Sequence, residues 1–217
     1  MWKKFKKYII KILFPAQCIS CKKYNTFLCK NCLLKIPLRQ RLKQEKPLDL
    51  LMSASFFHNK IIKKLIHGFK YDKNKELIKA IIKIIDKYFK KHPKLINTLQ
   101  KRNFWLVPIP LSYKKHKIRG FNQAKIIAQS ISKKYNLKIF YPLAKKTTKP
   151  QARLNLKQRR ENIKGAFFIK KYFKNKINKN ICLIDDTATT KATLKQAAKI
   201  LKENNAKKIW AFTIART

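Results

Sequence analysis

The sequence predicts an α/β fold in which a largely parallel sheet is covered by helices on both faces. First, short apolar runs typical of strands alternate along the chain with stretches whose apolar residues recur at helical spacing. Second, 45% of the 217 residues are hydrophobic and 12% are aromatic, which suffices for a buried core and excludes a disordered chain. Third, the apolar run at 181–184 leads through two acids and a small polar segment into a helical stretch, in the order of a strand–loop–helix unit.

The expected elements follow one another from residue 50 onwards. We expect strands at 50–57, 104–109, 167–169, 181–184 and 209–214, and helices at 61–67, 77–89, 121–135 and 194–204. A turn is expected at 67–72, and Pro93 is expected to help end the second helix. The chain divides into residues 1–48, which end in a polar basic connector at 36–48, and an α/β domain at 49–217.

The chain is strongly basic. It has 55 lysines and arginines against nine acidic residues, which gives a net charge of +46 at pH 7. A field of this sign favours polyanionic partners, namely nucleic acid, anionic lipid or phosphorylated metabolites. An AT-rich genome also produces an excess of Lys with Ile, Asn and Phe, so composition leaves both explanations of the charge open.

The first residues superficially resemble a signal peptide. However, Lys11 interrupts the apolar run and no small-residue cleavage site follows, so we expect a cytoplasmic protein without a transmembrane span. Five apolar residues fall near one face of a helix: Trp2, Phe5, Ile9, Ile12 and Leu13. That face either packs on the protein's own domain or lies at an anionic membrane surface.

Four of the five cysteines form two C-x₂-C pairs, Cys18/Cys21 and Cys29/Cys32. Such pairs allow two tight turns to place four thiolates around Zn²⁺. The alternative is a pair of disulfides, which suits neither a cytosolic chain nor two closely matched pairs. Because four protein ligands fill a tetrahedral site, we expect the zinc to be structural. Cys182 lies within an apolar strand and is expected in the core.

Asp185 and Asp186 follow the apolar run 181–184 and precede four threonines within seven residues, 187–193. A loop of small residues that opens a helix can direct backbone N–H groups at a phosphate, and the helix dipole assists. The two carboxylates can accept hydrogen bonds from sugar hydroxyls or hold a hydrated metal. Together these features predict a site for a phosphorylated ribose, whereas the simpler alternative is that the acids and threonines only cap the helix.

Two further polar segments are candidates for anion binding. Residues 108–123 follow an expected strand and supply Lys, His and Arg on a loop, where ligands bind in open α/β sheets. Arg119 is the most informative of these residues, because arginine is scarce in this chain and binds phosphate through two hydrogen bonds. Residues 145–162 form a long polar segment of the kind that can close over a site.

The chain resembles the ComF family of competence-associated proteins, which are similar to type I phosphoribosyltransferases. The segment 185–193 resembles the diphosphate-sugar signature of those enzymes. The four-cysteine module, 108–123 and 151–167 extend the resemblance over nearly the whole chain. It implies a type I phosphoribosyltransferase-like fold and binding of 5-phosphoribosyl 1-diphosphate, with Mg²⁺ bridging the diphosphate to the sugar.

The resemblance also implies roles for individual residues. Asp185 and Asp186, as candidate catalytic residues, contact the ribose hydroxyls. The phosphoribosyl-binding loop consists of Thr187, Ala188, Thr189, Thr190, Lys191, Ala192 and Thr193. The diphosphate loop contains Ser112, Lys115, Arg119 and Gly120. The flexible loop that closes over the site contains Gln151, Arg153, Arg159 and Asn162.

One position departs from the family pattern, which has glycine where this chain has Lys191. If that position requires a positive φ, a side chain costs about 1–2 kcal/mol or obstructs the ligand. Alternatively, the lysine ammonium reaches the phosphate and compensates. We expect ligand binding to be weakened but retained.

Three functions follow from the sequence. The first is Mg²⁺-dependent phosphoribosyl transfer to an unidentified acceptor. The second is a non-catalytic role in DNA uptake, for which the resemblance implies single-stranded DNA and a competence helicase as partners. Its sequence support is the basic charge and aromatic residues that could stack on bases, namely Trp2, Phe69 and Tyr71. The third is a folded but inactive member of the family.

Overall fold

The computed structural model describes residues 2, 15–40, 42–72, 74–146, 166–174 and 177–217. Its main sheet contains β1 (Lys43–Glu45), β2 (Leu48–Phe56), β3 (Phe104–Pro108), β6 (Asn180–Ala188) and β7 (Ile209–Arg216). The strand order is β1-β2-β7-β6-β3; β1 is antiparallel to β2 and the remaining neighbours are parallel. The largely parallel sheet expected from the sequence is therefore confirmed.

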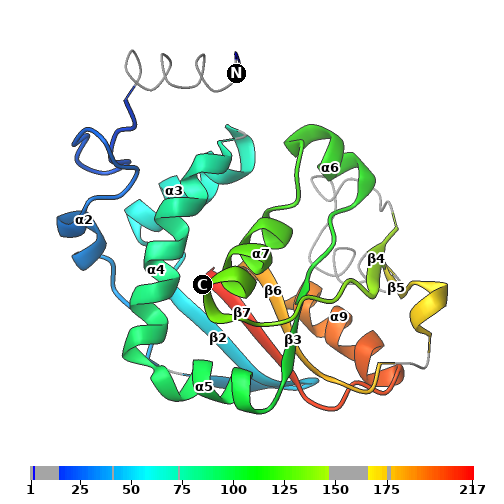
Figure 1. Ribbon diagram of the computed structural model, residues 1–217. Coiled ribbons are helices and arrows are strands. Elements are labelled where there is room, and N and C mark those ends of the chain that lie inside the picture. The colour runs from blue at the N-terminus through cyan, green and yellow to red at the C-terminus, as the bar shows by residue number, and fades with distance from the viewer. Residues whose placement is uncertain (1, 3–14, 41, 73, 147–165, 175–176) are drawn as a thin grey trace.

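Helices cover both faces of this sheet (Figure 1). The helices are α2 (Lys30–Leu34), α3 (Lys60–Tyr71), α4 (Ile78–Lys91), α5 (Pro93–Lys101), α6 (Tyr113–Arg119), α7 (Gln123–Tyr135) and α9 (Ala192–Glu203), with 3₁₀ turns at Lys75–Leu77 and Lys171–Phe173. One buried cluster joins α3, α4, α5 and most of α7 to one sheet face, and a second joins α9 to the other. The alternation along β6 divides the clusters, because Cys182 and Ile184 belong to the first and Ile181 and Leu183 to the second.

A small antiparallel pair, β4 (Leu143–Lys145) and β5 (Phe167–Ile169), forms a separate sheet. The strand expected at 167–169 is confirmed, but it does not join the main sheet, and its partner β4 was not expected. Leu143 and Phe167 pack into the cluster beneath α9. This packing holds β4 beside the carboxyl ends of the main strands.

In the first half of the chain, several helices and strands have boundaries that differ from the sequence prediction. The turn expected at 67–72 is wrong, because α3 continues to Tyr71 and Gly68 lies inside it. A Cβ at Gly68 would lie 2.8 Å from Leu77 Cδ1, so close packing explains this glycine. Pro93 does end the preceding helix, but it also occupies the first turn of α5, where its missing N–H costs nothing. The connector at 36–48 contains β1.

Two differences lie closer to the expected ligand site. The strand expected to end at 184 continues to Ala188, because its pairing with β7 extends through Asp185↔Thr213 and Thr187↔Ala215. The segment expected to be a loop at 113–119 is the helix α6, which ends at Gly120 with φ 74°. A left-handed residue at this position terminates a helix, and glycine adopts that conformation without a steric penalty.

The cysteine-containing segment packs against α4. Cys18, Leu28 and Cys32 belong to the same buried cluster as the apolar side of α4. Lys87 of α4 donates to the carbonyls of Leu33, Leu34 and Ile36 at 3.0, 3.0 and 2.8 Å. Burial lowers the pKa of the Lys87 ammonium. The domain division at residue 48 stays a prediction.

Candidate functional site

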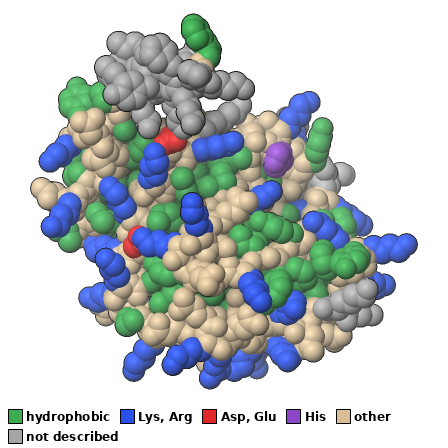
Figure 2. Space-filling view, in the orientation of Figure 1, with side chains coloured by type: hydrophobic (Ala, Val, Ile, Leu, Met, Phe, Trp, Pro, Cys, Tyr) green, Lys and Arg blue, Asp and Glu red, His purple; other side chains and the backbone are tan. Residues whose placement is uncertain are grey.

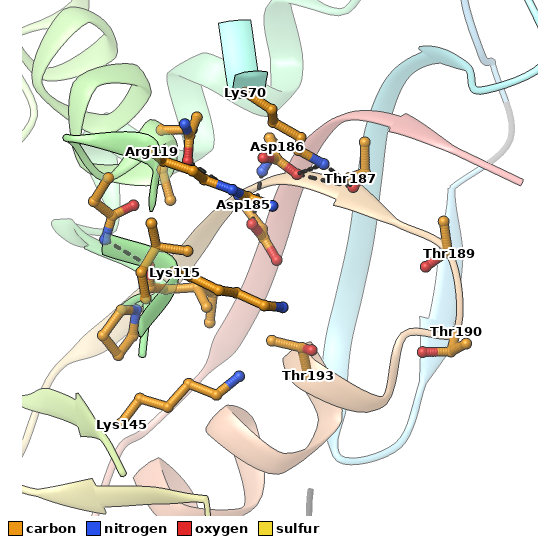
Figure 3. Close-up of a pocket in the computed structure, with 16 residues that line it drawn as sticks. Lys70, Lys115, Arg119, Lys145, Asp185, Asp186, Thr187, Thr189, Thr190 and Thr193 are labelled. Carbon is orange, nitrogen blue, oxygen red and sulfur yellow. Dashed lines mark hydrogen bonds and ion pairs between the residues drawn. The ribbon is translucent and has the colours of Figure 1, made fainter. Parts of the chain in front are cut away.

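A pocket of about 280 Å³ opens at the carboxyl ends of β3 and β6. This is the edge of a parallel sheet at which ligands bind in open α/β folds. Figure 3 shows polar side chains from helices, strands and a loop converging on the pocket. The lining residues with charged or hydroxyl side chains are Lys70, Lys115, Arg119, Lys145, Asp185, Asp186, Thr187, Thr189, Thr190 and Thr193.

The two acids lie on β6 and have different surroundings. Asp186 is buried, and its Oδ1 receives Lys70 Nζ at 2.9 Å and the Thr187 hydroxyl at 2.8 Å. Asp185 is half-buried, and its Oδ1 accepts the backbone N–H of Asp186 at 2.8 Å. Desolvation and the neighbouring charge of Asp186 raise the pKa of Asp185 to about 7. The pocket therefore holds one carboxylate paired with lysine and one that resists ionisation.

The loop from β6 into α9 supplies the threonines of the pocket. Thr189 and Thr190 are exposed on the loop, and Thr193 lies in the first turn of α9. The N-terminal N–H groups of a helix and the hydroxyls beside them can donate to an anion. Ala188 is buried and Ala192 begins the helix, and neither side chain lines the pocket.

Lys191 has φ 56° and ψ −6°, in the left-handed region. The positive φ considered for this position is therefore present. Its ammonium pairs with Glu45 of β1, which also pairs with Lys195 at 3.0 Å. Hydrogen bonds from Lys191 and Lys195 lower the pKa of Glu45 to about 2. Lys191 does not line the pocket, unlike Thr190 before it and Thr193 after it.

Cationic side chains line the pocket opposite the threonines. Lys115 and Arg119 come from α6, and Lys145 from β4. Arg119 donates to Gln123 Oε1 at 3.2 Å, and its guanidinium lies 5.6 Å from the centre of the Tyr71 ring. Burial and the nearby Lys115 lower the pKa of Lys145, whereas Asp185 opposes that shift.

The four paired cysteines lie together on the N-terminal segment. The sulfur atoms of Cys18, Cys21, Cys29 and Cys32 are all within 4.8 Å of one another. Cys21 Sγ and Cys29 Sγ are 3.6 Å apart, close to the roughly 3.8 Å separating sulfurs in a tetrahedral site with metal–sulfur bonds of about 2.3 Å. All the cysteines are free thiols in the structure, so the disulfide alternative finds no support. The cluster could hold a metal ion.

Comparison with known proteins identifies the family. No family model matches the chain. It is 30% identical to Competence protein F of Haemophilus influenzae over 51% of this chain and 49% of that protein. It is 29% identical to Competence protein ComFC of Bacillus subtilis over 75% and 62%, and 26% identical to the DNA utilization protein YhgH of Escherichia coli O157:H7 over 95% and 85%. The chain belongs to the ComF family.

The first two relatives match over only part of their length, since the alignments span about half of the Haemophilus protein and less than two thirds of the Bacillus protein. The match to the Escherichia coli protein extends over nearly all of the chain. Both parts of this ComF protein, the cysteine-containing segment and the α/β domain, therefore fall within a region of family similarity.

The structure brings together some of the site residues expected from the ComF resemblance. Lys115 and Arg119 of the expected diphosphate loop line the pocket with the acids and threonines. Ser112 is buried at the start of α6 and Gly120 ends that helix, so neither lines the pocket. The expected flexible-loop residues lie outside the described residues: Gln151, Arg153, Arg159 and Asn162.

Lys70, Lys145 and Gln123 are among the pocket residues that the sequence analysis did not name as site residues. Lys70 was assigned to a turn, although it lies on α3 and reaches across to β6. Lys145 was noted as the start of a polar segment but not as a ligand, and strand β4 is what aims it at the pocket. Gln123 is buried and donates to the carbonyl of Phe69 at 3.3 Å. The helix expected at 61–67 was the sequence signal nearest to Lys70, but it was drawn too short to include this residue.

The surface of this ComF protein is basic over a wide area. Figure 2 shows Lys and Arg side chains scattered over the whole visible face, with no single stripe. Of the aromatic residues expected to stack on bases, Trp2 and Tyr71 are exposed, but Phe69 is buried in the core and cannot do so. Among the described residues, no helix has the length and apolar character needed to cross a bilayer.

Proposed function

We propose that the pocket of this ComF-family protein binds 5-phosphoribosyl 1-diphosphate together with Mg²⁺. The observation that carries the proposal is the distribution of charge. Two carboxylates at the end of β6 lie between a threonine-rich loop and a group of cations on α6 and β4. A sugar with phosphate groups at two ends matches this order of hydroxyl donors, acids and cations.

Each part of the pocket has a chemical counterpart on that ligand. Thr189, Thr190 and the N–H groups that begin α9 suit the 5′-phosphate. The acids suit the ribose hydroxyls, because carboxyl oxygens accept hydrogen bonds from hydroxyl groups. Lys115, Arg119 and Lys145 suit the diphosphate.

We further propose that the protein transfers the phosphoribosyl group. The bond from ribose C1 to the diphosphate oxygen breaks, diphosphate leaves with the electron pair, and a nucleophilic atom of the acceptor bonds to C1. Cations fixed in the pocket before reaction stabilise the departing diphosphate. Mg²⁺, when bound, neutralises part of the same charge.

The names of the relatives support a role in DNA metabolism. The Bacillus and Haemophilus proteins are named competence proteins and the Escherichia coli protein a DNA utilization protein. We propose that this chain acts in the uptake or use of DNA. We also propose that Cys18, Cys21, Cys29 and Cys32 bind a structural Zn²⁺, because four thiolates at tetrahedral separations are its preferred ligands.

Calorimetric titration of the zinc-loaded protein with 5-phosphoribosyl 1-diphosphate tests the proposal. We expect Mg²⁺-dependent binding that disappears in the Asp185→Asn, Asp186→Asn double variant. Asp49→Asn is the control, because it removes a carboxylate at the amino end of β2, whereas the pocket lies at the carboxyl ends of the strands and does not include Asp49. Absence of binding by the folded wild-type protein would refute the proposal.

A second candidate is non-catalytic handling of single-stranded DNA. The observation that favours it is a group of exposed aromatic and basic side chains beside the pocket. Tyr71 and Tyr113 are 55% and 75% exposed, and the Arg119 guanidinium lies 5.6 Å from the centre of the Tyr71 ring. Aromatic side chains that alternate with cations bind single strands through base stacking and phosphate contacts. Salt-dependent binding of oligodeoxythymidine that the acidic double variant leaves unchanged would favour this function.

A further inference from the structure

Asp185 and Asp186 are adjacent in sequence but face opposite sides of the sheet. Successive residues of a strand alternate, so Asp186 shares the face of Cys182 and Ile184, which is covered by α3 and α4. Asp185 shares the other face, which is covered by α9. In Figure 3, Asp186 turns toward Lys70, whereas Asp185 points to the side of Lys115 and Thr193.

Lys70 makes a closed set of contacts with the end of β6. Its Nζ lies 2.9 Å from Asp186 Oδ1 and donates to Thr187 Oγ1 at 3.2 Å, while Thr187 Oγ1 donates to Asp186 Oδ1 at 2.8 Å. The side chains of Lys70 and Asp186 are only 15% and 9% exposed. Charged groups so shielded interact more strongly than surface pairs, and removing one partner leaves the other buried without compensation.

The end of α3 is itself held in place. Gln123 donates to the carbonyl of Phe69, the residue before Lys70, at 3.3 Å and accepts from Arg119 at 3.2 Å. The rings of Phe69 and Phe121 are 5.3 Å apart in the core. Packing therefore fixes the backbone position from which Lys70 reaches β6. The Gln123 side chain links this position to Arg119 on α6.

We propose that Lys70 is a positioning residue that divides the acidic pair, holding Asp186 as an internal anchor so that Asp185 is the carboxylate presented to the sugar hydroxyls. This inference rests on the proposed function for the identity of the ligand. The Lys70–Asp186 pairing neutralises one acid within the protein. Asp185 is then the carboxylate that faces Lys115, Arg119 and Lys145 across the space where the ligand lies.

The first test needs no ligand. Urea unfolding of Lys70→Met, Asp186→Asn and their double variant forms a cycle that isolates the coupling between the two residues. We expect each single variant to lower the ratio of folded to unfolded protein. In the double variant this ratio should fall about tenfold less than the product of the two single-variant decreases. The matched control is the same cycle with Lys115→Met and Asp186→Asn, in which the decreases in the folded-to-unfolded ratio should multiply. Multiplicative losses in the Lys70 cycle would overturn the proposal.

The second test uses 5-phosphoribosyl 1-diphosphate with Mg²⁺ as the probe. At pH 8, above the pKa of Asp185, Asp185→Asn should weaken binding by more than about a hundredfold, which is roughly the loss of a charge-assisted contact. Lys70→Met and Asp186→Asn should each cause a smaller loss that does not accumulate in the double variant, and Lys70→Arg should restore most of the affinity. Equal losses in Asp185→Asn and Asp186→Asn, independent of residue 70, would show that both acids contact the ligand directly.

The two tests separate the two proposals. If the wild-type protein does not bind the probe, the proposed function fails and with it the role of Asp185, while the unfolding cycle still decides whether Lys70 anchors Asp186. If the probe binds but the cycle shows no coupling, the proposed function stands and the division of the acidic pair is wrong.

Discussion

Replacement of Lys191 by glycine separates two opposing contributions to the stability of the loop before α9. The φ of 56° costs an L-residue about 1–2 kcal/mol relative to glycine. Against this, the ion pair with Glu45, whose partners are 23% and 17% exposed, contributes about 0.2–1 kcal/mol. Glycine also costs roughly 0.5–1 kcal/mol through the greater freedom of the unfolded chain. Lys191→Gly should therefore unfold within about 1 kcal/mol of the wild-type free energy.

The same substitution should become stabilising when Glu45 is removed first. In a Glu45→Gln background the ion pair is already lost, so glycine brings the relief of strain without that penalty. The expected result is a stabilisation of about 0.5–1 kcal/mol relative to Glu45→Gln alone. Alanine in the same background keeps the positive φ, and Lys191→Ala should therefore change the free energy by less than about 0.5 kcal/mol.

Urea unfolding at pH 7, followed by tryptophan fluorescence, measures the free energies of the wild type and the four variants. The reasoning is refuted if glycine destabilises the Glu45→Gln protein, or if alanine stabilises it as much as glycine does. Because Lys191 does not line the pocket, Lys191→Gly should also bind 5-phosphoribosyl 1-diphosphate within about threefold of wild type. A much larger loss would mean that the ammonium leaves Glu45 to contact the phosphate.

Three other predictions concern pH, metal and packing. The pKa of Asp185 is raised from 3.8 to about 7, so its contribution to stability is present at low pH and is lost as pH rises through 7. Asp185→Asn should therefore gain stability relative to wild type at pH 8, keep only part of that advantage at pH 5 and lose it below pH 3.8, as measured by urea unfolding. Cys29→Ser should lose bound zinc in metal analysis and lower the midpoint of thermal unfolding, whereas Cys182→Ala should retain the metal. Lys87→Met should cost about 1–3 kcal/mol of unfolding free energy, because partly buried carbonyls lose a charged donor. Replacement of the exposed Lys91 on the same helix by Met should cost less than about 0.5 kcal/mol.

Local sequence predicted the features that depend on neighbouring residues. Two C-x₂-C pairs bring four thiols together, because each pair closes within one tight turn and only seven residues separate the pairs. The run before Asp185 indicates a buried strand, and the helix after it follows from apolar spacing. The error at this point was small: the strand continues through the acids, because pairing with β7 outweighs the weak strand preference of Asp.

Contacts between distant parts of the chain were beyond local prediction. Lys70 and Thr187 are 117 positions apart, and Glu45 and Lys191 are 146 positions apart. Nothing in the residues around Lys70 distinguishes it from the many other lysines, since its partner becomes available only when α3 packs on β6. The helix α6 was missed for a related reason, because its seven residues are too few for a stable isolated helix and show no buried side.

Periodicity and spacing over a few residues predicted most of the strands and helices, the clustering of four cysteines, and the acids and threonines that follow one strand. The contacts that these groups make depend on the packing of segments that are far apart in the sequence. The adjacent acids face opposite sides of β6, and Asp186 forms an ion pair with Lys70. Lys191 forms an ion pair with Glu45 and does not line the pocket. A charged side chain pairs with the opposite charge that lies close to it in the folded protein, and the packing of helices on the sheet determines which charge that is.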